Sequence, residues 1–96
     1  MKHPPIEAMA LAKWLLDEGA CSAARVWQEG KSLVTVWESC ERGDWIEWLL
    51  SHCNYQWKAP AWDEYKRVKA LALDEYERVK ADTIRKLIPY PFEVQP

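Results

Sequence analysis

Hydrophobic residues along the first half of the chain recur at helical spacing. Four short segments carry them at intervals of three and four residues, which is the pattern of a helix with one buried face. These segments cover about residues 6–18, 22–29, 32–40 and 44–52. The stretch "LVTV" contains β-branched residues that favour strands, but its apolar positions 33, 36, 37 and 40 keep the helical interval. We therefore predict an all-α fold.

Residue types that start and stop helices mark the ends of these segments. Each of the three glycines follows a helical segment, where a left-handed residue is favoured: Gly19, Gly30 and Gly43. Ser32 is the expected N-cap of the third helix. Asp44 is the expected N-cap of the fourth, and Glu47 three residues later completes a capping-box pattern. Residues 1–59 are thus predicted to form a cluster of about four short helices.

The stretch from Ala61 to Ile88 contains neither glycine nor proline and nearly repeats itself every eleven residues. Eleven residues in three helical turns keep a repeated side chain on one face of a straight helix. The stripe on that face would carry these residues: Ala61, Tyr65, Val68, Ala72, Tyr76, Val79, Thr83 and Leu87. We predict that the short helices pack on one long C-terminal helix over residues 60–88, about 40 Å in length. A Pro-rich tail over residues 89–96 would pack only locally.

This predicted helix is longer than any of the short helices that would cover it. Helices of 10–14 residues span about 15–21 Å, so the outer half of the long helix would extend past the core. One interpretation is that the helix only covers the core. The other assigns partner binding to residues of the outer half: Tyr76, Val79, Ile84 and Leu87. In that case Tyr65 and Val68, in the inner half, would be structural.

The chain is unusually aromatic, with seven tryptophans and four tyrosines among its 96 residues. Four tryptophans lie at the spacing of a helical core: Trp14, Trp37, Trp45 and Trp48. Trp57 lies in the polar connection "NYQWKAP", beside Tyr55. Two interpretations stay open for this pair. It is an exposed aromatic pair that binds a partner, as hot-spot residues do, or Trp57 folds back as a lid on a small core.

Composition and charge disfavour several function classes. The 13 basic and 15 acidic residues give a net charge of −2, whereas a dedicated nucleic-acid binder usually has a basic excess. No run approaches the ~18 apolar residues of a membrane span, and the N-terminus is a poor signal peptide. Three cysteines without a framework spacing fit reduced thiols in a cytosol. We expect a cytoplasmic protein with neither a membrane nor a nucleic acid as partner.

Few residues form a group that would carry catalysis or hold a metal. Cys40, His52 and Cys53 lack the paired spacing of structural zinc ligands, so we expect buried cysteines, no metal and no other cofactor. The "RGD" tripeptide at residues 42–44 is explained by the end of one helix and the start of the next. The chain has no glycine-rich phosphate loop and no nucleophile–base motif. We expect that it is not an enzyme.

Two segments resemble small uncharacterised phage and prophage proteins. The first, "VWESCERGDWIEWLL", has the form Trp-x-x-Cys-x-Arg-x-Asp-Trp-x-x-Trp-Leu, which falls on Trp37, Cys40, Arg42, Asp44, Trp45, Trp48 and Leu49. The second, "DEYKRVKALALDEYERVKA", resembles the Glu-Tyr-x-x-Val repeats that follow that segment in many such proteins. Together they cover roughly residues 26–81. The resemblance implies a mobile element inside a bacterial cell, and it carries over no functional residue.

The leading functional hypothesis is a non-enzymatic protein-binding module that acts on a bacterial host protein or complex. Small acidic helical phage proteins often inhibit host defence, as anti-CRISPR proteins do, but this analogy rests on size and source alone. One alternative is a self-assembling accessory protein whose repeat helix forms a homodimer. Another is a small-ligand or nucleotide binder that uses an exposed tryptophan.

Overall fold

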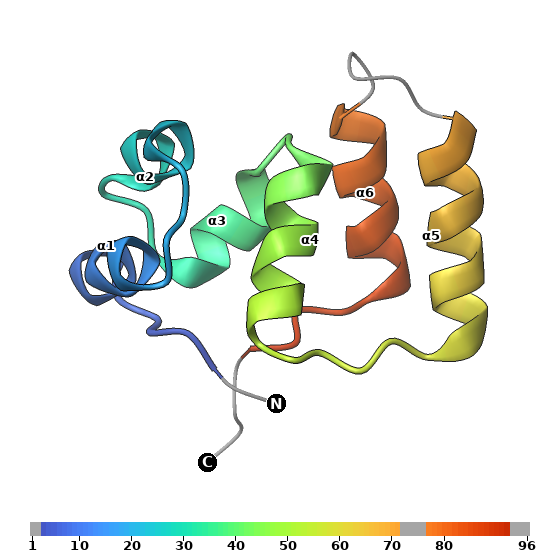
Figure 1. The fold of residues 1–96 in the computed structure, drawn as a ribbon, viewed down its shortest axis with the longest axis horizontal. Coiled ribbons are helices and arrows are strands. Elements are labelled where there is room, and N and C mark those ends of the chain that lie inside the picture. The colour runs from blue at the N-terminus through green and yellow to red at the C-terminus, as the bar shows by residue number, and fades with distance from the viewer. Residues whose placement is uncertain (1–2, 72–76, 93–96) are drawn as a thin grey trace.

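The computed structural model describes residues 3–71 and 77–92, and this part of the chain is entirely helical apart from its connections (Figure 1). The prediction of an all-α fold is therefore confirmed. The helices are α1 (Ala8–Asp17), α2 (Ser22–Gln28), α3 (Leu33–Ser39), α4 (Gly43–His52), α5 (Ala59–Leu71) and α6 (Glu77–Leu87).

α1 and α2 lie at one end of the molecule and α5 and α6 at the other, with α3 and α4 between them. In Figure 1, α1 and α2 lie together at the left, α3 and α4 at the centre, and α6 and α5 at the right. α6 packs between α4 and α5. The four short helices before Pro60 agree with the predicted segments to within about two residues, the usual uncertainty of helix ends.

The prediction of one long helix over residues 60–88 is wrong. α5 and α6 are separate helices of similar length, and they run antiparallel side by side (Figure 1). This arrangement places α6 against α4 and buries Ala81 and Ile84 completely. Burial of one large aliphatic side chain contributes about 1.5–3 kcal/mol. In one straight helix, Ala81 and Ile84 would lie in the outer half and stay exposed to water. The free energy gained by burying them therefore outweighs the local preference for an uninterrupted helix.

The two copies of the eleven-residue repeat bury different faces. Ala70 of α5 is exposed, whereas its counterpart Ala81 of α6 is fully buried. Val68 is half-buried, but its counterpart Val79 is 45 % exposed. The buried face of this region therefore includes Ala81, Ile84 and Ile88 rather than the predicted stripe through Val79. Identical side chains take different roles because α6 packs between α4 and α5, whereas α5 packs mainly against α6.

The sequence predicted that Asp44 caps the start of α4, but a residue of α6 supplies the cap. Asp44 does not cap α4, because its carboxylate pairs with Arg42 at 3.0 Å. Instead the backbone N–H of Asp44 donates to Glu77 Oε1 on α6, at 3.2 Å. The carboxylate of Glu47 accepts from the hydroxyl of Tyr65 instead, so no capping box forms. The Ser32 cap is confirmed, since its Oγ accepts from the backbone N–H of Thr35 at 3.4 Å.

Gly43 allows α4 and α6 to approach closely. It is the first residue of α4 and is buried, so it does not end a helix as predicted. A Cβ at this position would meet the Cβ of Lys80 and lie 3.0 Å from the backbone nitrogen of Ala81. The other two glycines follow the prediction, because both adopt a positive φ after a helix: 84° at Gly19 and 77° at Gly30.

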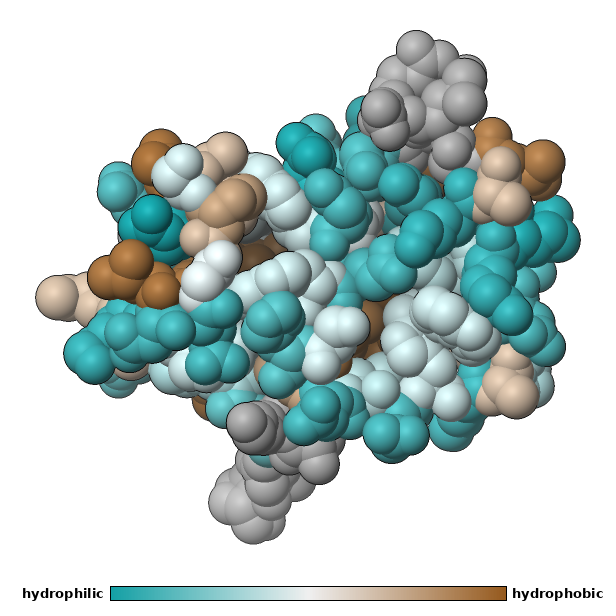
Figure 2. All heavy atoms as spheres, viewed as in Figure 1, coloured by the Kyte–Doolittle hydropathy of each residue, from teal (hydrophilic) through white to brown (hydrophobic). Residues whose placement is uncertain are grey.

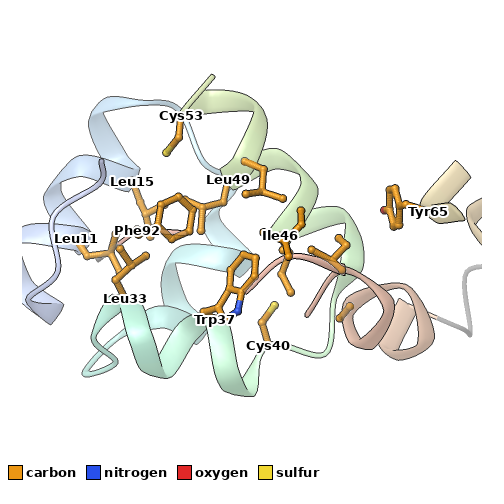
Figure 3. Packing of buried hydrophobic residues seen from close by; sticks show 14 residues of the cluster. Leu11, Leu15, Leu33, Trp37, Cys40, Ile46, Leu49, Cys53, Tyr65 and Phe92 are labelled. Carbon is orange, nitrogen blue, oxygen red and sulfur yellow. The ribbon is translucent and has the colours of Figure 1, made fainter. Parts of the chain in front are cut away.

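The segment after α6 enters the core, contrary to the prediction that the tail packs only locally. Phe92 is buried, and its ring centroid lies 5.7 Å from that of Trp37 in an edge-to-face arrangement. Figure 3 shows Phe92 among the side chains of α1, α3 and α4. Trp37 is also the one of the four predicted core tryptophans that is buried, because Trp14, Trp45 and Trp48 keep part of their surface in solvent.

Candidate functional site

Three half-buried aromatic side chains form a surface between the end of α4 and the start of α5. We call Tyr55, Trp57 and Trp62 the aromatic patch. The centroid of the Trp57 ring lies 6.0 Å from that of Tyr55 and 5.0 Å from that of Trp62, both at steep interplanar angles. Such edge-to-face contacts are favourable for aromatic rings, so the three residues form one continuous cluster.

The C-terminus of α4 sets the direction of the chain that carries this patch. Asn54 adopts a left-handed φ of 55° just after the helix. The N–H of Tyr55 donates to the carbonyl of Leu50, and the N–H of Asn54 donates to that of Ser51, at 3.0 and 3.1 Å. These two bonds form a Schellman motif, which reverses the chain at a helix end. The reversal brings Tyr55 and Trp57 toward α5.

Trp57 acts as a lid on the buried ring of Tyr65. The two rings stack with centroids 5.2 Å apart and an interplanar angle of 22°. Tyr65 is fully buried, whereas Trp57 keeps part of its surface in solvent. Both interpretations of Trp57 therefore describe part of its environment: one side covers the core, and another is accessible.

A polar contact beneath the patch joins α4 to α5. The hydroxyl of Tyr65 donates to Glu47 Oε2 at 3.0 Å, and Lys69 Nζ lies 2.9 Å from Glu47 Oε1. Burial raises the pKa of Tyr65 above its ordinary value, and the neighbouring carboxylate of Glu47 raises it further. Tyr65 therefore stays protonated and remains a hydrogen-bond donor at neutral pH.

An open depression runs beside the aromatic patch. Its lining combines the patch with small and polar side chains: Glu47, Ser51, Tyr55, Gln56, Trp57, Ala59 and Trp62. Lys66 Nζ lies 5.9 Å from the Trp62 ring centroid, within the range of a cation–π contact. The depression thus offers rigid aromatic faces with hydrogen-bonding groups at their edge.

The other residues predicted to bind a partner do not join this surface. Val79 is exposed and Leu87 half-buried, but neither lines the depression. Ile84 is fully buried and has no surface to offer a partner in this conformation, because it packs in the core. Tyr76 lies outside the described residues. The aromatic patch therefore contains Tyr55 and Trp57 from the predicted set, together with Trp62.

The cysteines and histidines of the described residues are not grouped, and Cys21 and His3 lie exposed at the surface. Cys40 and Cys53 are buried, as expected, and burial raises the pKa of the Cys40 thiol. His52 stacks on Trp48 with ring centroids 3.7 Å apart. Within residues 3–71 and 77–92, no three His, Cys, Asp or Glu side chains lie close enough together to hold a metal ion.

A second feature, an apolar cavity of about 330 Å³, lies among α1, α2, α3 and α4. Aromatic and aliphatic side chains form most of its wall, including Trp27, Trp37, Trp45 and Trp48. In Figure 2, hydrophobic side chains gather over the α1–α2 end, at the left, where Met9, Leu16 and Val26 are exposed. This cavity could not be predicted from the sequence, because it depends on how the four short helices are arranged.

No protein-family model, curated protein or solved structure matches this chain. The resemblance to phage and prophage proteins therefore stays a prediction. Among the described residues, no helix is both long enough and apolar enough to cross a bilayer.

Proposed function

We propose that this chain is a non-enzymatic protein-binding module of phage or prophage type, which binds a bacterial host protein through the aromatic patch. The observation that carries the proposal is the clustering of Tyr55, Trp57 and Trp62 beside an open depression. Tryptophan and tyrosine are the residue types that most often dominate binding energy at protein interfaces. The buried Tyr65 ring packs against Trp57 and Trp62, and Trp57 in turn packs against Tyr55, so ordering these rings on binding costs little side-chain entropy.

The polar groups around the patch suit a protein partner. Glu47, Ser51 and Gln56 supply donors and acceptors at the edge of the aromatic surface. Protein interfaces commonly combine an aromatic centre with a polar rim of this kind. The resemblance to phage proteins supports a cytoplasmic host protein as the partner. A defence complex, inhibited as anti-CRISPR proteins inhibit theirs, is the first class to test.

Affinity capture from a bacterial lysate, followed by hydrogen exchange on the captured complex, tests this proposal. The tagged protein is incubated with lysate, and the retained proteins are identified by mass spectrometry. We expect the amides of residues 55–62 to be protected in the complex, because the partner covers the patch. Capture of no host protein, or a footprint confined to α1 and α2, would contradict the proposal.

The homodimer alternative is favoured by a different surface. Leu71 at the end of α5 is 72 % exposed, and Val79 of α6 is 45 % exposed. A second copy of the chain could cover these side chains, although the single repeat helix first expected to pair is not present. Light scattering over a range of concentrations decides between the states. A mass near 11.3 kDa at every concentration contradicts the dimer.

A further inference from the structure

Arg25 of α2 is a cation without an ionic partner beside the apolar cavity. Its Nε donates to the carbonyl oxygen of Ala20, a residue of the cavity wall, at 3.3 Å. The residue is half-buried, and it forms no ion pair within residues 3–71 and 77–92. Its two terminal nitrogens make no hydrogen bond in this part of the chain either. A half-buried charge loses part of its hydration, and a bound anion would compensate for that loss.

The contact with Ala20 places Arg25 at the opening of the cavity. Ala20 lies between Gly19 and Cys21, and both of these neighbours line the cavity and are exposed. The cavity therefore meets the solvent beside this segment, close to the guanidinium group. A ligand that enters here would bring an anionic group to Arg25 and place its remaining atoms in the cavity.

The wall of the cavity determines what those remaining atoms are. Of the described residues that line it, Asp44 alone is charged, and Arg42 pairs with its carboxylate at 3.0 Å. A charge deeper in the cavity would lose its hydration without gaining a partner. The wall is mostly aliphatic and aromatic, and the rings of Trp27 and Trp45 are tilted with their centroids 5.9 Å apart. Such walls favour planar aromatic ligands through offset and edge-to-face contacts.

The volume of the cavity sets the size of the ligand. An apolar cavity of about 150 Å³ is large enough to bind benzene. The cavity of about 330 Å³ is roughly twice that size, so it suits a pair of fused rings.

We propose that this cavity binds a bicyclic aromatic carboxylate, whose rings lie among α1, α2, α3 and α4 and whose carboxylate pairs with Arg25 at the opening. The cavity shares no lining residue with the depression beside the aromatic patch, so this site is independent of the proposed protein interface.

Two probes of nearly the same shape test the need for an anion. Naphthoate carries a carboxylate, and the matching naphthamide carries a neutral amide in its place. Each is titrated by calorimetry at neutral pH against the unaltered protein. We expect naphthoate to bind at least about tenfold more tightly, as a charge-assisted pair with one guanidinium group allows. Equal affinities would overturn the role of Arg25, and absence of naphthoate binding would overturn the site.

Two charge variants assign the carboxylate to Arg25. Arg25→Gln removes the charge and keeps a hydrogen-bond donor, so naphthoate should then bind no more tightly than naphthamide. Lys13→Gln removes the same charge from α1, at an exposed residue that pairs with Asp17 and does not line the cavity. This control should change the affinity for naphthoate by less than about twofold, because exposed distant charges are screened. Equal losses from both variants would overturn the pairing with Arg25. The probe pair on the unaltered protein decides even if Arg25→Gln fails to fold.

Two variants of α2 locate the rings. Ala24 lines the cavity, whereas the adjacent Ala23 is exposed and does not. Ala24→Phe should fill the space and abolish naphthoate binding, while Ala23→Phe should leave the affinity unchanged within about twofold. Equal binding by the two variants would show that naphthoate binds elsewhere and would overturn the proposal.

The thiol of Cys21 reports on the same site in the unaltered protein. Cys21 is exposed and lines the cavity, whereas Cys40 and Cys53 are buried. Saturating naphthoate should therefore slow the alkylation of Cys21 by N-ethylmaleimide several-fold, because the reaction requires access to the thiol. An alkylation rate that naphthoate leaves unchanged would overturn the proposal.

Discussion

The buried hydroxyl of Tyr65 donates a hydrogen bond to Glu47 Oε2 at 3.0 Å, and this bond joins α5 to α4. It also explains why Glu47 does not cap its own helix. The ring of Tyr65 lies under Trp57, so the same residue supports the aromatic patch from below. The proposed binding surface therefore depends on Tyr65 keeping this position.

Tyr65→Phe should remove this bond while the ring keeps its place. We expect a loss of about 1.5–3 kcal/mol in the free energy of unfolding, the range for a hydrogen bond to a charged group. Urea unfolding at pH 7 measures it. Tyr55→Phe is the matched control, because the Tyr55 hydroxyl makes no hydrogen bond within the described residues. Equal losses from both variants would contradict the Tyr65–Glu47 bond.

The same variant should change the response to alkaline pH. Burial raises the pKa of Tyr65 in the folded protein, whereas an unfolded tyrosine releases its proton near pH 10. The unfolded chain therefore binds fewer protons above about pH 10, and the free energy of unfolding falls as the pH rises. We expect this fall to be steeper in the unaltered protein than in Tyr65→Phe. Parallel curves would contradict the burial of a protonated Tyr65.

Removal of Glu77 should cost more than removal of Asp44. Glu77 accepts the N–H of Asp44 and pairs with Lys80 at 3.0 Å, where both side chains are largely buried. We expect Glu77→Ala to cost about 2 kcal/mol, through a lost cap and an unpaired Lys80. Asp44→Ala removes a half-exposed ion pair with Arg42 and should cost less than about 1 kcal/mol. Chemical denaturation measures the loss of stability of each variant. A larger loss from Asp44→Ala than from Glu77→Ala would show that Asp44 caps α4.

A methyl group at position 43 should separate α4 from α6. Gly43→Ala adds a Cβ that meets Lys80 and the backbone of Ala81. Overpacking of this kind typically costs about 1–3 kcal/mol. The residue is helical, so the usual preference for alanine in a helix acts in the opposite direction. An unchanged or higher thermal midpoint would show that α6 does not contact this face of α4.

Truncation of the last buried aromatic should destabilise the whole domain. Phe92 lies in the core against Trp37 and Tyr90. We expect Phe92→Ala to cost about 3–5 kcal/mol, as large-to-small core substitutions do. Pro89→Ala, at an exposed position of the same segment, is the control. If both variants unfold at the same denaturant concentration, the segment after α6 does not contribute to the core.

Helical periodicity was sufficient to predict the four short helices, because each carries a local pattern of its own. The Ser32 cap and the turn at Gly19 were predictable for the same reason, since each depends on residues within a few positions. The cap of α4 was not predictable in this way. Asp44 and Glu77 are 33 residues apart, and only the packing of α6 brings them together.

The eleven-residue repeat is the reason that two separate helices, α5 and α6, were not predicted from the sequence. Eleven-residue copies without glycine or proline favour one straight helix on local grounds. The same copies also supply apolar residues to two helices that lie side by side, and the burial of Ala81 and Ile84 decides between these outcomes. Tyr55 and Trp57 could be singled out as candidates because they are two aromatic residues in an otherwise polar connection. The burial of Gln28 had no such signal, because it depends on packing against α1, where its amide nitrogen donates to the carbonyl of Ala8.

Binding of the captured host protein to two matched variants of α5 tests the central claim most directly. Ala59 is exposed and lines the depression beside the aromatic patch, whereas Ala70 is exposed on the same helix and does not. Exposed substitutions of this kind change folding stability little. We predict that Ala59→Arg raises the dissociation constant at least about tenfold, as at an interface hot spot, while Ala70→Arg leaves it unchanged. Equal dissociation constants for the two variants would contradict a partner site at the aromatic patch.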